Sequence, residues 1–181
     1  MIILASKSPR RKALLEREHI NFIIETVETE ELFDSKLTVE DALLNVAYQK
    51  GKPVFDKHNK DTVISADTIV YCDNKILGKP RDLTEAKEML LFLSNKTHQV
   101  MTGVVIFKEK ETIKWVEKTD VTFNELSVEE IEEYIYHNNV LDKAGSYAIQ
   151  EGAANLIKST NGDYDNIVGL PVKKVIKFLN N

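Results

Sequence analysis

The sequence predicts an α/β fold with a mixed β-sheet, because helical stripes and strand-like runs alternate along the chain. Thr62 to Val70 is a strongly β-branched run, which is typical of a buried strand. Two long strand-like runs, His98 to Phe107 and Thr112 to Phe123, are joined by a charged turn and predict a hairpin. The length of 181 residues predicts a single domain, or two small lobes that share a core.

The first elements are predicted from apolar runs and from a helix-start signal. Met1 to Ala5 is a short apolar run and predicts a buried strand. Ser8 is a good N-cap and Pro9 suits the first helical position, so a helix is expected to follow and to run to about Glu18. Asn21 to Val27 predicts a second strand.

Two further helices are predicted from their caps and apolar stripes. Thr38 is expected to begin one of them, with Asp41 in a position like that of a capping box. Gly51 and Pro53 predict its end. Thr84 is expected to cap the other helix. Their predicted core faces are Val39, Leu43, Val46 and Ala47 in the first, and Ala86, Met89, Leu90 and Leu93 in the second.

The last third of the chain is predicted to contain a helix, a hairpin and a final helix. Ser127 and Glu130 form a capping box, which predicts a helix start. Asn161-Gly162 is a strong two-residue hairpin signal. The strands expected on either side of it cover residues 155–160 and 163–168. Gly169-Leu170-Pro171 is expected to open the final helix.

The composition argues against several classes of protein. With 43% hydrophobic and 29% charged residues, the chain has the balance of an ordinary globular protein. Its longest stretch without Asp, Glu, Lys or Arg, Thr97 to Phe107, has eleven residues. A membrane-spanning helix needs about twenty apolar residues, so no membrane association is expected. The first residues lack a basic leader before a long apolar stretch, so no signal peptide is expected.

Cysteine content and net charge argue against further kinds of site and classes of protein. Cys72 is the only cysteine, which excludes an internal disulfide and a cysteine-based zinc cluster. A single cysteine suits a reducing compartment, so a cytoplasmic location is expected. The net charge of -5 disfavours a general nucleic-acid-binding protein, and no nucleic-acid partner is expected.

The charges are unevenly distributed near the N-terminus. Residues 1–20 contain five basic and two acidic side chains, whereas residues 25–41 contain seven acidic and one basic. Two solvated faces would explain this pattern without any function. The alternative is an anionic ligand that carries a cation, held by basic residues at the anion and acidic residues at the metal.

The segment Ser6-Lys7-Ser8-Pro9-Arg10-Arg11 is the first candidate site, between a predicted strand and a predicted helix. A helix N-terminus carries partial positive charge and unpaired N–H groups, so basic residues in the first turn oppose the helix dipole. A bound phosphate chain would remove this conflict, although solvated arginines on an exposed turn remain an alternative. The glycines of a P-loop are missing.

Asp67 is the second candidate, because it interrupts a run that is otherwise typical of a core strand. A buried carboxylate costs free energy unless it is paired, binds a metal or reaches a cleft. It could serve as a metal ligand or as a general base toward water. A strand-end carboxylate bonded to a neighbouring loop is the alternative.

Three more polar residues are weaker candidates. Lys79 precedes a proline, which restricts it to an extended backbone in a stiff turn. Lys50 lies near the end of its predicted helix, where it complements the helix dipole. Gln150 belongs to an uncharged, strand-like segment, and its amide could recognise a base edge or simply fix a loop.

Together these segments resemble the Maf family of nucleoside triphosphate pyrophosphatases. Six pieces match in the family's order and cover nearly the whole chain, which predicts one Maf-like domain over residues 1–181. They are Leu4 to Arg11, Ser65-Ala66-Asp67-Thr68, Gly78 to Asp82, His98 to Val104, Asp142 to Gln150 and Gly169-Leu170-Pro171.

The resemblance implies a fold and a reaction. The fold would be that of the inosine triphosphate pyrophosphatases, with an elongated mixed sheet, helices packed around it and a cleft between two lobes. The reaction would be hydrolysis of a nucleoside triphosphate to the monophosphate and pyrophosphate, with a divalent metal cation as cofactor. The hard oxygen ligands leave Mg, Mn and Co as alternatives.

The resemblance also implies roles for individual residues. Asp67 would accept the proton of the water that attacks the α-phosphorus, or would bind the metal. Glu31 aligns with an acidic position thought to help with the metal. The catalytic lysines would be Lys50 and Lys79. The substrate-binding residues would be Ser6, Arg10, Arg11, Thr68 and Gln150, of which Arg11, Thr68 and Gln150 match the branch that acts on dTTP and UTP.

Two alternatives to this activity stay open at the level of the sequence. One is a non-catalytic nucleotide sensor on the same fold, linked to septum formation through a protein partner. The other is the sister branch of the family, which prefers 7-methyl-GTP. Modified pyrimidine analogues could replace the common nucleotides as substrates. A homodimer is possible, since family members often form one.

Overall fold

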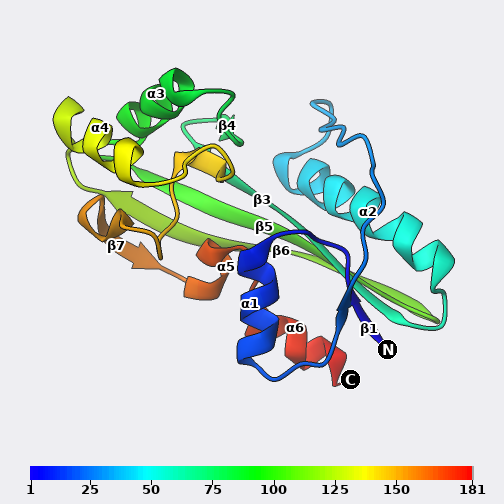
Figure 1. Ribbon diagram of the computed structural model, residues 1–181. Coiled ribbons are helices and arrows are strands. Elements are labelled where there is room, and N and C mark those ends of the chain that lie inside the picture. Colours follow the sequence, from blue (N-terminus) through cyan, green and yellow to red (C-terminus); the bar gives the residue numbers. More distant parts are fainter. Residues whose placement is uncertain (181) are drawn as a thin grey trace. The chain divides into compact units, whose positions relative to one another are not determined.

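The computed structural model describes residues 1–180 (Figure 1). Its strands are β1 (Ile2–Leu4), β2 (Ile23–Ile24), β3 (Thr62–Cys72), β4 (Lys75–Leu77), β5 (Thr97–Lys108), β6 (Glu111–Phe123) and β7 (Ile157–Asn161). Its α-helices are α1 (Pro9–Arg17), α2 (Val39–Lys57), α3 (Leu83–Leu93), α4 (Val128–His137), α5 (Tyr164–Val168) and α6 (Val172–Leu179). Two short 3₁₀ helices are η1 (Ala144–Ser146) and η2 (Ala153–Asn155).

The strands form one seven-stranded mixed sheet in the order β2-β1-β3-β5-β6-β7, with β4 paired to β3. Strand β1 runs parallel to both β2 and β3, and Leu4 lies opposite Ile64 of β3. The pairs β3–β4 and β6–β7 are antiparallel. The expected α/β class and mixed sheet are therefore confirmed.

The chain forms two compact units. The first unit contains residues 1–68, residues 102–117 and the chain from Gly169 onward. The second contains residues 69–101 and 118–168. The single domain and the cleft expected from the resemblance stay predictions.

The core of the first unit lies where α2 packs on the sheet. Phe107 of β5 is buried and contacts the rings of Tyr48 and Phe55 of α2, with centroids 5.2 and 5.3 Å away. The other buried members of this cluster are Ile3, Ala5, Ala47, Val54, Val63 and Val105. Burial of this apolar surface fixes α2 against β3 and β5.

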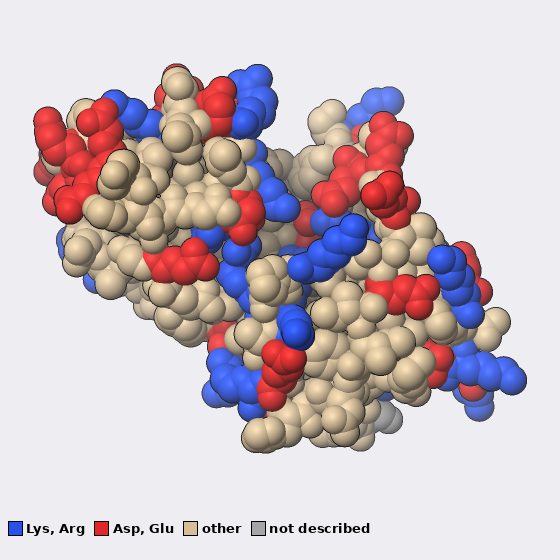
Figure 2. All heavy atoms as spheres, viewed as in Figure 1, with Lys and Arg blue, Asp and Glu red and all other residues tan. Residues whose placement is uncertain are grey.

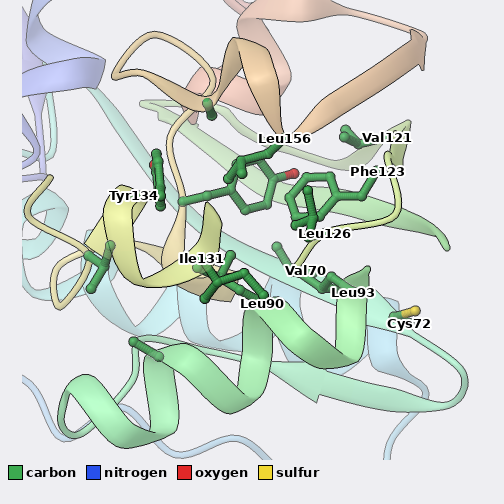
Figure 3. Close-up of a cluster of buried hydrophobic side chains, with 14 of the residues drawn as sticks. Val70, Cys72, Leu90, Leu93, Val121, Phe123, Leu126, Ile131, Tyr134 and Leu156 are labelled. Atoms are coloured by element: carbon green, nitrogen blue, oxygen red, sulfur yellow. The ribbon is translucent and has the colours of Figure 1, made fainter. Parts of the chain in front are cut away.

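The second unit has its own apolar core, which packs α3 and α4 against strands (Figure 3). Leu90 and Leu93 of α3 and Ile131 of α4 are fully buried in it. The outer face of α4 carries four glutamates, which group at one end of this unit (Figure 2). Such a helix, apolar on one face and acidic on the other, buries only its inner stripe.

Several predicted helix ends agree with the structure. The Ser8 side chain accepts a hydrogen bond from the backbone N–H of Arg11, and Pro9 occupies the first turn. Thr38 caps α2 through the N–H of Asp41. The capping box of Ser127 and Glu130 is present in full, with both of its hydrogen bonds formed.

Two helix boundaries were predicted wrongly. Helix α2 continues through Pro53 to Lys57, because Val54 and Phe55 pack in the core of the first unit, and this burial outweighs the lost backbone hydrogen bond. Helix α3 is capped by Asp82 and not by Thr84, since the Asp82 carboxylate accepts the Glu85 N–H at 2.8 Å.

Two strand predictions were also wrong. The strand expected from Asn21 to Val27 is reduced to Ile23–Ile24. The hairpin expected at Asn161-Gly162 is absent from the described chain, because β7 pairs with β6 and is followed by α5. The Asp163 carboxylate accepts the N–H of Asp165 at 2.8 Å and so starts a helical turn in place of a strand.

Within residues 1–180, no helix is both long enough and apolar enough to cross a membrane.

Candidate active site

The loop that joins β1 to α1 presents the N-terminus of α1 together with basic side chains. Ser6 Oγ accepts the backbone N–H of Ser8 at 3.2 Å, and this bond tightens the loop before the helix. The first turn of α1 contains no acidic residue and carries Arg10 and Arg11. The positive end of the α1 dipole and the two arginines therefore offer an anion complementary charge at one place.

Arg11 is buried and connects three segments of the first unit. Its guanidinium donates to the Gly169 carbonyl at 2.8 Å, to Ser6 Oγ at 3.1 Å and to Thr68 Oγ1 at 3.0 Å. All three acceptors are neutral oxygens. Burial lowers the pKa of Arg11, and the nearby Asp67 carboxylate acts in the opposite direction. A buried cation with neutral acceptors favours an incoming anion.

Lys50 of α2 is paired with two carboxylates. Its ammonium lies 2.6 Å from Asp67 Oδ1 and 3.1 Å from Glu31 Oε1. The side chains of Lys50 and Asp67 are both about four-fifths buried, whereas that of Glu31 is exposed. Glu31 comes from the acidic segment before α2, so one residue of that segment contacts this lysine.

The close approach of α2 to β3 positions Lys50. Gly51 is buried, and a Cβ placed on it would lie 2.4 Å from the Phe107 ring and 2.5 Å from Ser65 Oγ. Ser65 Oγ in turn donates to the Ala47 carbonyl at 2.7 Å. A glycine at position 51 therefore lets the helix lie directly on the strand, within reach of Asp67.

Asp67 and Thr68 lie on a part of β3 that follows the end of β1. Strand β1 pairs with residues 62–64 of β3, and β4 pairs with residues 70–72. Successive strand side chains point to opposite faces, and accordingly Asp67 contacts α2 while Thr68 contacts α1. The carboxyl end of a parallel strand is a common position for ligand sites in α/β sheets.

The structure therefore brings most of the predicted site residues together in the first unit. They are Ser6, Arg10, Arg11, Glu31, Lys50, Asp67 and Thr68. Arg10 is half-exposed in the first turn of α1.

The two remaining predicted residues, Lys79 and Gln150, belong to the second unit. Both are exposed. Their segments are joined by a hydrogen bond from the Gly145 N–H to the Gly78 carbonyl, at 3.1 Å. The strand-like conformation expected around Gln150 was wrong, since this segment contains η1 and turns. The left-handed backbone at Gly145, with φ of 68°, is incompatible with an extended strand.

Among residues 1–180, no group of three His, Cys, Asp or Glu side chains is arranged to hold a metal ion. The two acidic side chains that could contribute are Glu31 and Asp67, which share the Lys50 ammonium. Carboxylate oxygens suit a hard divalent cation, and two of them would leave room for water and substrate oxygens as further ligands.

Sequence reasoning gave no role in the site to three residues that shape it. Thr102 of β5 is buried and lies 2.9 Å from Thr68, hydroxyl to hydroxyl. Gly169 supplies the carbonyl that holds Arg11, and Gly51 allows the approach of α2. Thr102 lies in the matched piece His98 to Val104 and is the single hydroxyl of the run Met101 to Phe107, and these were the signals available for it.

Comparisons with known proteins agree on a family for this chain. The family model described as "Maf-like protein" matches residues 1–181. A "dTTP/UTP pyrophosphatase" of Bacillus cytotoxicus is 46% identical over 177 residues, which are 98% of this chain and 93% of that protein. A "dTTP/UTP pyrophosphatase" of Bacillus mycoides is 45% identical over 178 residues, with the same coverage of each chain.

A solved structure shares the fold. The Ham1 protein of Staphylococcus aureus superposes with a TM-score of 0.55 at 14% sequence identity, covering 99% of this chain and 97% of that one. At this identity the likeness concerns the fold alone.

Proposed function

Since the chain belongs to the Maf-like protein family, we propose that it hydrolyses dTTP and UTP to the nucleoside monophosphate and pyrophosphate. The observation that carries this proposal is the contact of two consecutive residues of β3 with two cations: Asp67 with Lys50, and Thr68 with Arg11. A carboxylate for proton transfer thus lies beside a cationic anion-binding turn, as a nucleotide pyrophosphatase requires.

Binding of the triphosphate is assigned to the turn before α1. The positive end of the α1 dipole, the Ser6 hydroxyl and the guanidinium groups of Arg10 and Arg11 all favour phosphate oxygens. Lys79 is proposed to add a further cation. Gln150 is proposed to recognise the base through its amide.

Proton transfer is assigned to Asp67. A water molecule attacks the α-phosphorus, its proton passes to a carboxylate oxygen of Asp67, and the bond to the β-phosphate breaks to release pyrophosphate. Lys50 holds the carboxylate at 2.6 Å and so limits its orientation, while its charge offsets that of the phosphates. Most of the catalytic effect would come from placement and charge.

A divalent cation fits the donor oxygens of Glu31 and Asp67, with Mg, Mn or Co as candidates. When bound, such a cation would neutralise charge on the substrate phosphates and on the departing pyrophosphate. The Lys50 ammonium already contacts both carboxylates, so Lys50 is expected to shift toward the phosphates when a cation binds. A cytoplasmic location and a homodimer also stay predictions.

The test is pyrophosphate release from dTTP, UTP, CTP, 7-methyl-GTP and ITP, each with and without a divalent cation. We expect release from dTTP and UTP that depends on the cation. Preferred release from 7-methyl-GTP would instead assign the chain to the sister branch of the family, which prefers that substrate. Binding of dTTP or UTP without any release would identify a nucleotide sensor and contradict the proposal.

A further inference from the structure

The loop that carries Gln150 is fastened to a buried lysine within the second unit. The Lys143 side chain is only 3% exposed. Its ammonium lies 2.8 Å from Asp142 Oδ1 and 2.9 Å from Glu151 Oε2, and it also donates to the Asn139 carbonyl. A buried ammonium requires such partners, so Lys143 and its acceptors hold one another in place.

Gln150 lies between two fixed points of this loop. On one side, the Ala148 N–H donates to the buried Tyr134 hydroxyl of α4 at 3.2 Å. On the other side, Glu151 is bound to Lys143, and its own N–H donates to the Ala148 carbonyl at 3.1 Å. The backbone is therefore restrained two residues before Gln150 and one residue after it, while the Gln150 side chain stays exposed.

A restrained amide can distinguish uracil from cytosine, whereas a loosely placed amide cannot. Uracil and thymine present an N3–H donor next to an O4 acceptor, and cytosine presents an N3 acceptor next to an N4–H₂ donor. A glutamine amide carries one acceptor and one donor group, and rotation by 180° exchanges them. Discrimination therefore depends on holding the amide at one position and orientation against the base edge.

We propose that Lys143 and Glu151 are positioning residues that hold Gln150 for recognition of uracil and thymine against cytosine. This inference rests on the proposed function, since it assigns the base-recognition role to Gln150. Glu151 transmits the restraint because it is the next residue in the chain. Asp142 binds the same ammonium but lies eight residues away from Gln150 in sequence.

The chain offers a matched control for this proposal. Glu151 and Asp142 each contact Lys143, and their side chains are similarly exposed, at 45% and 46%. Glu151→Gln and Asp142→Asn therefore remove the same kind of charge from the same cation at the same degree of exposure. Only the first of them is expected to release Gln150. Both sites are exposed enough for the variants to fold, which a thermal melt checks.

The experiment measures KM and kcat of the full chain for UTP and CTP at pH 7. Glu151→Gln should raise KM for UTP and lower the ratio of kcat/KM for UTP over CTP, each about fivefold, as expected for loss of a pair worth about 1 kcal/mol. Asp142→Asn should leave both quantities within about twofold of wild type. Tyr134→Phe removes the acceptor of Ala148 and should lower the ratio in the same direction as Glu151→Gln.

Two results would overturn the inference while leaving the proposed function intact: wild-type selectivity in both Glu151→Gln and Tyr134→Phe, or an equal loss in Asp142→Asn. Absence of pyrophosphate release from UTP by the wild-type chain would overturn the proposed function and this inference together.

Discussion

The Lys50 ammonium lies 2.6 Å from Asp67 Oδ1, and both side chains are largely shielded from solvent. This contact joins the second half of α2 to the stretch of β3 that follows the end of β1. A carboxylate held in this way is already oriented before substrate arrives, which is the preorganisation that proton transfer to a fixed base requires.

Replacing Asp67 by Asn should abolish most turnover while keeping the fold. The amide keeps the shape of the side chain but cannot accept the proton, so kcat for UTP should fall by roughly 10²–10⁴. Steady-state pyrophosphate release and a thermal melt are the measurements. Glu31→Gln is the comparison, because the Glu31 side chain is 57% exposed, and a smaller loss is expected. Near-normal release by Asp67→Asn would remove Asp67 from the role of base.

Arg10 and Arg11 should differ in their effects on stability. Arg11→Ala removes three hydrogen bonds and leaves the Ser6, Thr68 and Gly169 oxygens without this donor, so the free energy of unfolding should fall by about 3 kcal/mol.

Arg10→Ala should lower the free energy of unfolding less than Arg11→Ala does, because Arg10 is only partly buried whereas Arg11 is buried. It should raise KM and lower kcat, since the same charge binds the ground state and the transition state. Urea titrations of both variants and kinetics of Arg10→Ala check this contrast. An equal loss of stability in the two variants would contradict it.

Adding a methyl group at Gly51 should weaken the contact between α2 and β3. The new Cβ would overlap the Phe107 ring and Ser65 Oγ, so Gly51→Ala should cost about 1–3 kcal/mol of stability and reduce kcat. Gly78→Ala is the matched control for stability, because a Cβ there meets nothing within 4 Å. Chemical denaturation of both variants measures the difference. A Gly51→Ala protein as stable as the control would show that the helix approach is not tight.

The second unit should lose stability in mild acid because of His98. Its ring is buried, Nε2 lies 2.7 Å from the Tyr147 hydroxyl, and burial lowers the pKa of His98 from 6.5 to about 4. Below pH 6.5 the unfolded chain therefore binds a proton that the folded chain excludes. Stability is fully present above that pH and is lost as the pH falls toward 4.

Between pH 7 and pH 5 this histidine should account for about 2 kcal/mol of lost stability. Urea unfolding of wild type and His98→Gln at the two pH values measures the effect, and the loss should shrink in the variant. His137→Gln, at an exposed histidine of α4, should retain the wild-type loss. An identical pH dependence in wild type and His98→Gln would show that groups other than His98 cause the acid sensitivity.

Several helix starts and the family could be predicted from the sequence, because their signals are local or occur in a fixed order. Ser8 and Ser127 bond to backbone N–H groups three residues on, and such contacts depend on few other residues. The Maf family expected from the motifs is confirmed by the family model and the relatives.

The end of α2 and the contacts within the site could not be predicted, because they depend on contacts between distant segments. Pro53 predicts a helix end locally, yet burial of Val54 and Phe55 extends the helix past it. The pairing of Lys50 with Glu31 joins a loop to a helix, and the contact of Thr102 with Thr68 joins two strands. None of these contacts follows from residue spacing, because each is decided by how α2 and the strands pack.

The central claim is that water attacks the α-phosphorus of a pyrimidine nucleoside triphosphate beside Asp67. Its most direct test is hydrolysis of UTP in ¹⁸O-labelled water, with mass analysis of both products. The account predicts label in uridine monophosphate, unlabelled pyrophosphate, and formation of both products slowed by roughly 10²–10⁴ with Asp67→Asn. Label in the pyrophosphate, or release of inorganic phosphate in place of pyrophosphate, would contradict it.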